Sequence, residues 1–462
     1  AEVFTWIGAE GEPWPIEANW TPKEGRPGTD DTALINMPGQ VVLVVGTPSN
    51  PVPTVGNLTV TTGTKLDLGR LNINASDQGG GCCGLINNEG TIRIQSGILT
   101  IRSGQALLRG VGDLMMAKPI DPDKKGADVN KIMRQFGGTL VIKQTIHGTG
   151  LINVDLNNSL GTIDADIGGQ ELVLLRMDID NNGNDGGLRA SGGGTLRIQG
   201  SGGTGGEATV TNQGGSLLAF GDDSVVELSI ASKVVGGSLI AQNSGIIRGN
   251  GGTVKDVTIT GPMQIGDGGL TLTGTVANQG TITFLDTNTG NSHIRIGATL
   301  AGDKRMNLTG GGVIRMSNSN DQIRTNEHNI TLIHDTTTEG FGGIYTSNNT
   351  FAIDNRGTID ANVEGEELIV HPGTQVISTN TKTLRASNGG ILLLRGPAST
   401  SNNQCGEDQL CHWDNTEGTI EATDRRAAML AVERLGATPV SIHEQSAAKP
   451  KKEPRRKAQS KS

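Results

Sequence analysis

The stretch at residues 161–200 begins GTIDADIGGQELVLL, contains LRASGGGTL and ends RIQG. The stretch at residues 357–396 begins GTIDANVEGEELIVH, contains LRASNGGIL and ends LLRG. The two stretches align residue by residue without a gap. A recurrence of this length in register indicates a duplicated structural unit.

The duplication extends upstream of these two stretches. NEGTI, which starts at Asn88, recurs as NQGTI from Asn278, and the HGTG that contains Gly148 recurs as the EGFGG that contains Gly340. The interval between the copies changes by a few residues from one landmark to the next. Such changes are expected of insertions in surface turns, so the second copy is a variant of the first that ends earlier.

The composition favours a long and narrow fold. The chain has 462 residues, of which 70 are Gly, and its aromatic residues are 6 Phe, 4 Trp and 1 Tyr. A compact core normally uses aromatic side chains for bulk, whereas repeat arrays grow along one axis. Many thin layers filled with Ile, Leu and Val are therefore expected.

Short segments of alternating apolar and polar residues dominate the chain from Val41 onward. VVLVV, NLTV, KLDL, RLNIN, TIRI and ILTIR each have four or five residues, and this period of two is the pattern of strands. Turns rich in Gly and Asn separate them. We predict an all-β chain that forms a single elongated parallel β-helix (β-solenoid), right-handed, with about 20–25 residues per coil.

An asparagine that stands shortly before Gly-Thr-Ile supports the solenoid over a sandwich or a propeller. It occurs at Asn88, Asn278, Asn355 and Asn415. Equivalent positions of successive coils stack in a β-helix, so an Asn at an inward corner can form hydrogen bonds with its neighbours in a ladder. A sandwich gives no reason for this recurrence.

The N-terminal segment, residues 1–40, differs from the rest of the chain. It holds Trp6, Trp14 and Trp20, three of the four tryptophans. We interpret it as a cap that covers the first coil, because an open edge of β structure must be covered. A sugar-binding platform is the alternative interpretation.

The remaining boundaries follow from the pattern. The solenoid is predicted over residues 41–423, with its two copies covering about 88–277 and 278–423. Residues 424–436 include RRAAMLAVERLG, which places apolar side chains on one face and predicts a short helical cap. Residues 437–462 end in KPKKEPRRKAQSKS, which predicts a disordered basic tail.

One segment interrupts the alternation. KPIDPDKKGADVNKIMRQ, residues 118–135, is charged and contains two prolines. We predict a loop that projects from a corner of the solenoid, where such proteins make specific contacts. A solvated insertion without a partner is the alternative.

Charge and hydropathy exclude some partners. The formal net charge is −9, and an acidic body repels nucleic acid and anionic membranes. No apolar run approaches the length that spans a bilayer, so no membrane insertion is expected. The chain begins at Ala1, as expected of an exported protein whose signal peptide has been removed.

Four cysteines form two close pairs. Cys405 and Cys411 are a candidate disulfide for an oxidising compartment. A metal site there is less favoured because His412 is the only nearby additional ligand. A disulfide between the adjacent Cys82 and Cys83 would be strained. The alternatives are that these two cysteines are free thiols or that they form disulfides with another chain.

Several of these motifs together resemble a known group of proteins. ANWTP at residues 18–22, DTALIN from Asp31, the GTIDA elements, LRASGGGTL and TLTGTVANQGTI from Thr271 resemble the secreted, Gly-rich β-helix proteins of bacteria. They are similar to autotransporter passengers and filamentous-haemagglutinin-like adhesins. The resemblance covers about residues 3–423 and implies export, a surface or matrix role, and adhesion or scaffolding. It is specific for architecture rather than activity, and no translocator-barrel pattern accompanies it.

A β-helix can also cleave polysaccharides. Asp222 and Asp223 resemble the paired acids of pectin hydrolases, in which two carboxylates act as acid and base. The other motifs of that family, Asn-Thr-Asp, Gly-His-Gly and Arg-Ile-Lys, are missing from the sequence. We therefore assign no catalytic residue.

Asp178, Asp180 and Asn182 are a calcium candidate. They alternate as in a calcium-binding loop, where clustered oxygen ligands hold a hard cation. The carboxylate expected at the twelfth position is replaced by Arg189. No cofactor other than calcium is expected.

The sequence therefore predicts a non-enzymatic structural or adhesive solenoid at the cell surface or outside the cell of a bacterium. Self-association, in a surface filament or sheath, or association with other surface components is expected, and glycans are possible partners. The alternatives are a β-helix polysaccharide lyase or hydrolase and a monomeric glycan-binding adhesin. An enzyme predicts acids of neighbouring coils that converge on a groove, and an adhesin predicts an exposed aromatic patch.

Overall fold

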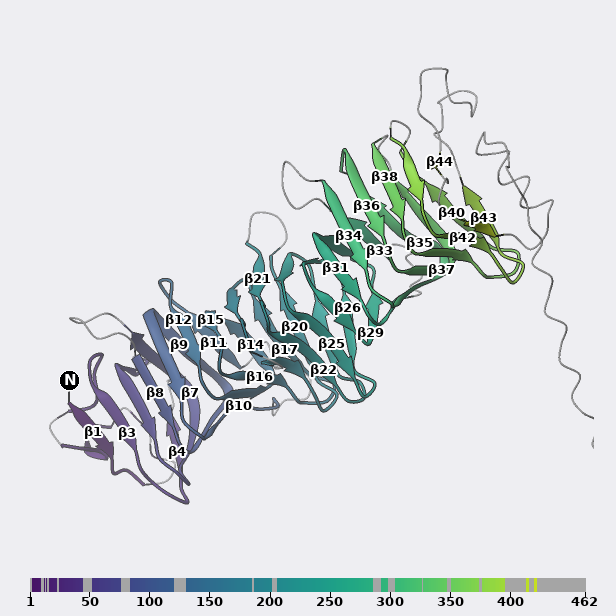
Figure 1. The fold of residues 1–462 in the computed structure, drawn as a ribbon. Helices are drawn as coiled ribbons and strands as arrows, with labels where there is room; N and C mark the ends of the chain where they lie inside the picture. Colours follow the sequence, from purple (N-terminus) through teal and green to yellow (C-terminus); the bar gives the residue numbers. More distant parts are fainter. Residues whose placement is uncertain are drawn as a thin grey trace, which may run out of the picture.

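The protein is an elongated β-solenoid in which short strands stack along one axis from β1 to β44 (Figure 1). This computed structural model has strands in most of the chain that it describes and no α-helix there; η1 (Glu17–Asn19) is a single 3-10 turn. The predicted all-β solenoid is confirmed. The described residues are 2–9, 12, 14, 16–22, 25–44, 52–75, 84–119, 130–184, 187–201, 206–285, 292–297, 304–325, 327–346, 350–373, 376–394, 413–414 and 419–421.

Each coil contributes one strand to each of three parallel sheets. Sheet 1 consists, in stacking order, of β4 (Val41–Val44), the first part of β7 (Lys65–Ala75), the first part of β9 (Thr91–Arg109), β10 (Asp113–Met116), β13 (Thr145–Gly148), β16 (Thr162–Ala165), β19 (Leu188–Ala190), β22 (Ser216–Phe220), β25 (Ser238–Gln242), β28 (Thr258–Thr260), β31 (Thr275–Asn278), β34 (Arg305–Thr309), β36 (Ile330–His334), β38 (Phe351–Asn355), β41 (Ser378–Asn380) and β44 (Trp413–Asp414).

Sheet 2 follows sheet 1 in every coil. It consists of β5 (Thr54–Val55), the middle parts of β7 and β9, β11 (Lys131–Arg134), β14 (Gly150–Asn153), β17 (Glu171–Leu175), β20 (Thr195–Gln199), β23 (Val225–Leu228), β26 (Ile246–Gly249), β29 (Pro262–Ile265), β32 (Thr281–Phe284), the first parts of β35 (Val313–Thr325) and β37 (Thr337–Thr346), β39 (Thr358–Ala361), β42 (Thr383–Ala386) and β45 (Thr419–Glu421).

Sheet 3 completes the coil. It consists of β1 (Val3–Trp6), β3 (Thr32–Ile35), β6 (Asn57–Val60), β8 (Gly84–Asn88), the last part of β9, β12 (Thr139–Ile142), β15 (Asp155–Asn157), β18 (Asp178–Asp180), β21 (Ala208–Thr211), β24 (Ser232–Val235), β27 (Gly252–Lys255), β30 (Leu270–Thr273), β33 (His293–Ile296), the last parts of β35 and β37, β40 (Glu367–His371) and β43 (Ile391–Leu394).

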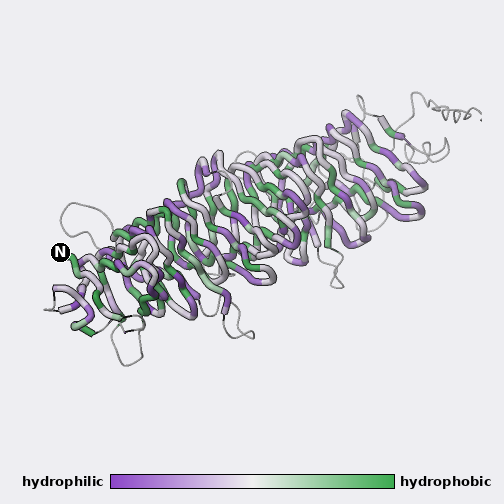
Figure 2. Tube along the Cα trace, turned by 90° about the horizontal axis from the view of Figure 1, so that it is seen from below, coloured by the Kyte–Doolittle hydropathy of each residue, from purple (hydrophilic) through white to green (hydrophobic). Residues whose placement is uncertain are grey.

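The core is a narrow column of aliphatic side chains. Alternate residues of each strand point inward, so hydrophobic and hydrophilic residues alternate along the coils (Figure 2). In sheet 1, Ile146 lies in register with Ile163, and Ile163 with Leu188, and all three are fully buried. Burial of one such side chain contributes about 1.5–3 kcal/mol, so stability is distributed over the whole column.

The three N-terminal tryptophans close one end of this column. Trp6, Trp14 and Trp20 are buried, and the rings of Trp14 and Trp20 pack edge to face with centroids 4.6 Å apart. Nε1 of Trp20 donates to the backbone oxygen of Trp14 at 3.0 Å. On the outer edge of β1, the antiparallel strand β2 (Trp20–Thr21) pairs with it. Because the indoles are buried, they offer no platform for a sugar, and this supports the cap interpretation.

The two copies of the repeat lie on different faces of the solenoid. Thr162–Ala165 is β16 in sheet 1, whereas the matching Thr358–Ala361 is β39 in sheet 2, and both have the same burial pattern. A second landmark shifts in the same direction: Gly148 ends a strand of sheet 1, and Gly340 lies in the part of β37 that belongs to sheet 2. The repeat therefore contains a whole number of coils and one additional strand, so that matching residues of the second copy lie on the next sheet.

The predicted loop at residues 118–135 is wrong in part. Lys131–Arg134 forms β11, which pairs in parallel with β9 and β14. Residues 120–129, the predicted C-terminal helix at 424–436, the basic tail and all four cysteines lie outside the described residues.

Asparagine ladders cross the corners of the coils. Asn158, Asn181 and Asn212 follow successive strands of sheet 3 and are fully buried. Nδ2 of Asn158 donates to Oδ1 of Asn181 at 3.0 Å, and Nδ2 of Asn181 donates to Oδ1 of Asn212 at 2.7 Å. Buried amide groups need such partners, because an unpaired one costs about 1–3 kcal/mol.

The second copy has its own asparagine ladder, which lies at the ends of strands of sheet 1 rather than after strands of sheet 3. Nδ2 of Asn355 donates to Oδ1 of Asn380 at 2.6 Å, so the predicted ladder is confirmed at Asn355. Asn88 and Asn278 are buried too, but their Oδ1 atoms accept from the backbone of their own turns. Asn415 lies outside the described residues.

A histidine begins this second ladder. His334 is fully buried, with Nδ1 2.8 Å from Oδ1 of Asn355 and Nε2 2.8 Å from Oγ1 of Thr338. Burial lowers the pKa of His334 below its ordinary value, and the hydrogen bond with Asn355 opposes this shift. The folded protein therefore binds the proton less readily than the unfolded chain, whose histidine titrates near pH 6.5.

This difference predicts acid sensitivity. The free energy of unfolding should fall by up to about 1.4 kcal/mol per pH unit below about pH 6.5 from this residue. We expect His334→Asn, which extends the asparagine ladder, to show a smaller loss between pH 7 and pH 5 in denaturant titrations. The exposed His328 provides the control: His328→Asn should keep the pH dependence of the wild type. Equal pH slopes for His334→Asn and the wild type would contradict the prediction.

Candidate functional site

The outer faces carry charged side chains that are paired between coils. Asp164 of β16 is 3% exposed, and its Oδ2 accepts from Nε of Arg189, in the next strand of sheet 1, at 2.7 Å. Oγ of Ser191 donates to Oδ1 of Asp164 at 3.0 Å. Both oxygen atoms of this carboxylate are therefore engaged, and it serves as a brace between two coils.

The second copy repeats the brace on sheet 2. Oδ2 of Asp360 accepts from Nε of Arg385 at 3.0 Å, and Oδ1 accepts from Oγ of Ser387 at 2.8 Å. The arginine and the serine shared by the two LRAS segments thus have the same structural role in both copies. The arginine neutralises the aspartate and the serine donates a hydrogen bond to it, so the carboxylate is not buried without partners.

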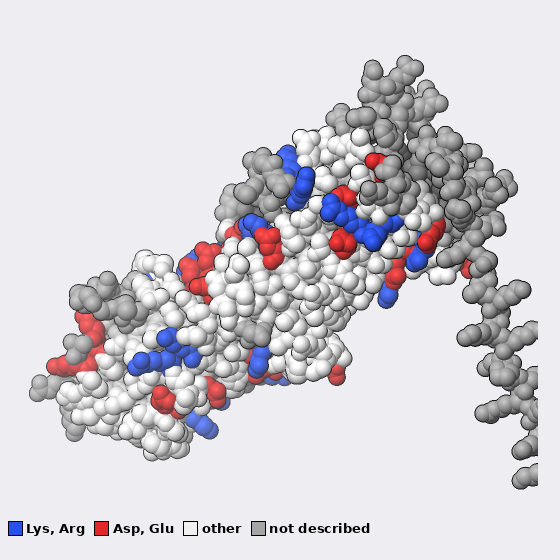
Figure 3. Space-filling model, viewed as in Figure 1, with Lys and Arg blue, Asp and Glu red and all other residues white. Residues whose placement is uncertain are grey.

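Further ion pairs continue along sheet 2. The guanidinium group of Arg197 lies 2.8 Å from Oε1 of Glu171 and 3.0 Å from Oε1 of Glu227, and Arg248 lies 3.7 Å from Oε2 of Glu227. In the view of Figure 3, charged side chains form small groups of both signs on a mostly uncharged face. Glu227 is buried, so its two arginine partners compensate a carboxylate that has lost most of its solvent.

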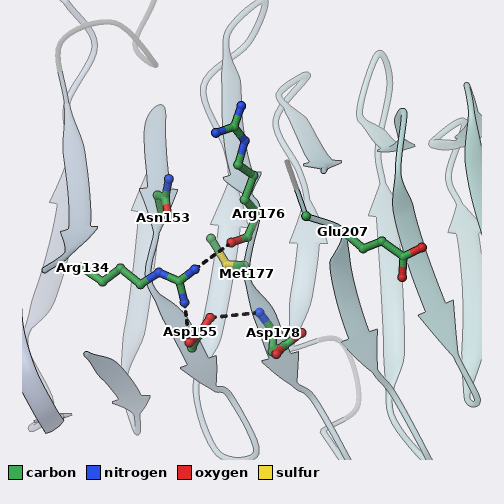
Figure 4. Close-up of a pocket in the computed structure, with 8 residues that line it drawn as sticks. Arg134, Asn153, Asp155, Arg176, Met177, Asp178 and Glu207 are labelled. Carbon is green, nitrogen blue, oxygen red and sulfur yellow. Dashed lines mark hydrogen bonds and ion pairs between the residues drawn. The ribbon is translucent and has the colours of Figure 1, made fainter. Parts of the chain in front are cut away.

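A shallow pocket lies where sheet 2 turns into sheet 3. Figure 4 shows that Arg134 faces Asp155, and that Asp178 lies beside Asp155 on the neighbouring strand. Nη1 of Arg134 donates to Oδ2 of Asp155 at 2.5 Å, and the backbone N–H of Asp178 donates to Oδ1 of Asp155 at 3.1 Å. The residues that line the pocket are Arg134, Asn153, Asp155, Arg176, Met177, Asp178, Gly206 and Glu207.

A polysaccharide-cleaving enzyme would need acidic side chains that converge on a groove, and three carboxylates, those of Asp155, Asp178 and Glu207, line this pocket. Both oxygen atoms of Asp155 already have partners, so this carboxylate is held as an ionic brace. Asp178 is exposed, and the carboxylate of Glu207 points away from both aspartates (Figure 4). The two exposed carboxylates of the pocket, Asp178 and Glu207, therefore do not face a common substrate position as an acid and a base would.

Two of the three calcium candidates lie on one strand. Asp178 and Asp180 stand at the two ends of β18, with the buried Ile179 between them. Oδ1 of Asp180 accepts from the backbone of Asn182 at 3.2 Å, and Oδ1 of Asn182 accepts from the backbone of Gln213 at 2.7 Å. These bonds shape the turn after β18, and calcium binding here stays a prediction.

The other candidate sites contribute little chemistry. Asp222 and Asp223 are both exposed in the turn between β22 and β23. No group of three or more His, Cys, Asp or Glu side chains in the described ranges is placed to hold a metal ion. Cys405 and Cys411 lie outside those ranges, so the candidate disulfide stays a prediction.

No protein family model, curated protein or solved structure matches the chain. Among the described residues, no helix has the length and apolar character needed to cross a membrane.

Sequence reasoning missed both the Asp155 pocket and the Asp164 brace. The signal for the brace was present, because Asp164, Arg189 and Ser191 recur at one interval as Asp360, Arg385 and Ser387. The pocket has no such signal, because Arg134 lies in the segment predicted to be a loop, and its pairing with Asp155 depends on β11.

Proposed function

We propose that this protein is a non-enzymatic, extracellular structural or adhesive shaft of a bacterial surface. The observation that carries the proposal is the pairing of buried and half-buried carboxylates on the faces of the sheets, as in Asp164 with Arg189 and Asp360 with Arg385. Carboxylates held in this way stabilise neighbouring coils and are not free to exchange protons with a substrate. The resemblance of the sequence to secreted β-helix proteins points in the same direction.

The architecture suits a spacer or scaffold. Each coil contacts mainly its neighbours, so length is gained without a larger core. The flat faces present repeated polar side chains that can contact other surface components over a long distance. At the N-terminal end, the short antiparallel β2 occupies the outer edge of β1, and this favours contacts along the sides of the shaft over stacking at that end.

Electron microscopy and a turnover assay test this proposal. We expect the purified chain to form narrow rods, and incubation with polygalacturonate or with neutral polysaccharides to release no new chain ends. Compact globular particles would contradict the shaft. Turnover that is lost in Asp178→Asn but retained in Asp222→Asn would replace the proposal with the alternative of a polysaccharide-cleaving enzyme.

A further inference from the structure

Two arginines on adjacent strands of sheet 3 lie directly opposite each other. Arg295 of β33 lies in register with Arg324 of β35. Neither guanidinium group forms an ion pair with any described carboxylate, and Nη1 of Arg324 donates only to the neutral Oε1 of Gln322, at 3.2 Å. Like charges directly opposite each other destabilise a sheet, so within the described residues this pair has an electrostatic cost without a compensating acid.

The pair differs from other arginines of the shaft. Arg189 and Arg385 each lie opposite an aspartate of the adjacent strand and bind it. The Nε atoms of both Arg295 and Arg324 are also buried without a hydrogen-bond partner. The fold therefore gains little from these two cations, whereas an external anion would remove their repulsion.

A histidine holds the two guanidinium groups together. Nη2 of Arg295 lies 3.1 Å from Nε2 of His293, and Nη2 of Arg324 lies 3.3 Å from the same atom. Two groups that converge on one nitrogen are close enough for one carboxylate or sulfate group to contact both. Each guanidinium has five N–H donors in a planar fork, so donors remain for the ligand.

An aromatic ring lies next to the two arginines. Tyr345, the only tyrosine of the chain, is in register with Arg324. Its ring occupies the space above Gly343, where any Cβ atom would overlap it. Burial raises the pKa of Tyr345, and the nearby charge of Arg324 opposes that shift. The ring is still partly exposed, so it provides an apolar surface beside the two guanidinium groups.

We propose that Arg295, Arg324 and Tyr345 form a binding site for an acidic polysaccharide. The two guanidinium groups bind a carboxylate or sulfate substituent, since charge-assisted bonds of arginine to such groups are the strong ones, and the ring of Tyr345 packs against the sugar. The net charge of the chain is −9, so the overall charge does not attract an anion, and affinity for one must come from local groups of positive charge such as this pair. This site goes beyond the proposed structural role, because it specifies the class of ligand that the protein binds, an acidic polysaccharide.

Binding of defined polymers to the full chain tests the site. The probes are polygalacturonate, dextran sulfate, neutral dextran and inorganic sulfate, measured by calorimetry at low salt and again at high salt. We expect one or both acidic polymers to bind and neutral dextran not to bind. The double variant Arg295→Gln with Arg324→Gln should weaken binding at least about tenfold, and Tyr345→Ala by about fivefold. High salt should weaken the wild type, because screening reduces charge attraction.

Arg109→Gln is the matched control, because Arg109 is an exposed arginine elsewhere on the shaft. It should bind as the wild type does. The proposal is overturned if neither acidic polymer binds better than neutral dextran, if Arg109→Gln weakens binding as much as each arginine of the pair does, or if inorganic sulfate alone binds as tightly as the polymers.

The stability of the double variant gives a second readout. Removal of two like charges should leave the thermal midpoint unchanged or raise it. A clear fall in the midpoint would mean that the arginines serve the fold, and it would overturn the proposal. This test is separate from that of the shaft, since rods without polysaccharide binding would leave the proposed function intact and reject only the site.

Discussion

Gly148→Ala is expected to lower the free energy of unfolding by about 2–6 kcal/mol, as the sum of backbone strain and overlap. Gly148 has φ +114°, which side-chain-bearing residues rarely adopt, and a Cβ atom there would overlap the backbone oxygen of Met116 in the preceding coil. That oxygen belongs to a paired strand, so it cannot move aside without breaking the stack. Chemical denaturation measures the loss.

The chain contains a replicate and a control for this substitution. Gly340 has φ +109° and the same overlap with the backbone oxygen of Met316, so Gly340→Ala should cause a similar loss. Gly169 has φ +69°, but no atom lies within 4 Å of the position that a Cβ atom would take there, so Gly169→Ala should cost only about 1–2 kcal/mol. Equal losses at Gly148 and Gly169 would show that close approach of the coils is not the cause.

Asn181→Asp is expected to lower the free energy of unfolding by about 3–5 kcal/mol at pH 7. The two side chains have the same shape, but a carboxylate cannot donate, and it would face Oδ1 of Asn212 at the 2.7 Å of the present hydrogen bond. The residue is fully buried, so the new charge would have no solvent. Denaturant titration of both proteins at pH 7 and pH 4 measures the effect.

The same substitution at the neighbouring Asn182 is a control that distinguishes the effect of burying a charge from the effect of adding one. Asn182 is exposed, and its Oδ1 already accepts a hydrogen bond from Gln213, a role that a carboxylate can keep. Asn182→Asp makes the same chemical change one residue away and should alter stability by less than about 0.5 kcal/mol. Burial raises the pKa of an aspartate, so the Asn181→Asp protein should recover stability relative to Asn182→Asp at pH 4. No recovery would contradict the explanation.

Much of the architecture was predictable because the strand pattern is local. VVLV at 41–44 and TALI at 32–35 alternate in the sequence, and their alternate side chains are buried in the structure. β11 was not predictable in the same way. KIMR has only two apolar residues and follows a charged, proline-containing segment, and it is a strand because β9 and β14 on either side supply backbone partners.

The outer surface was much harder to predict than the core. The position of Arg295 opposite Arg324, or of Arg134 opposite Asp155, depends on the register between coils. Turns of different length connect the strands, so the number of residues between neighbours in the stack varies from coil to coil. No local pattern in the sequence contains that register.

The sequence by itself determined that this chain is a duplicated array of short strands with glycine and asparagine at its corners. Those features depend on side-chain alternation and backbone freedom, which are local properties. Only the tertiary structure decided that the second copy is turned by one face, so that the Asp164 brace lies on sheet 1 and the Asp360 brace on sheet 2. The reason is that a coil closes after three strands, while the repeat contains one strand more than a whole number of coils.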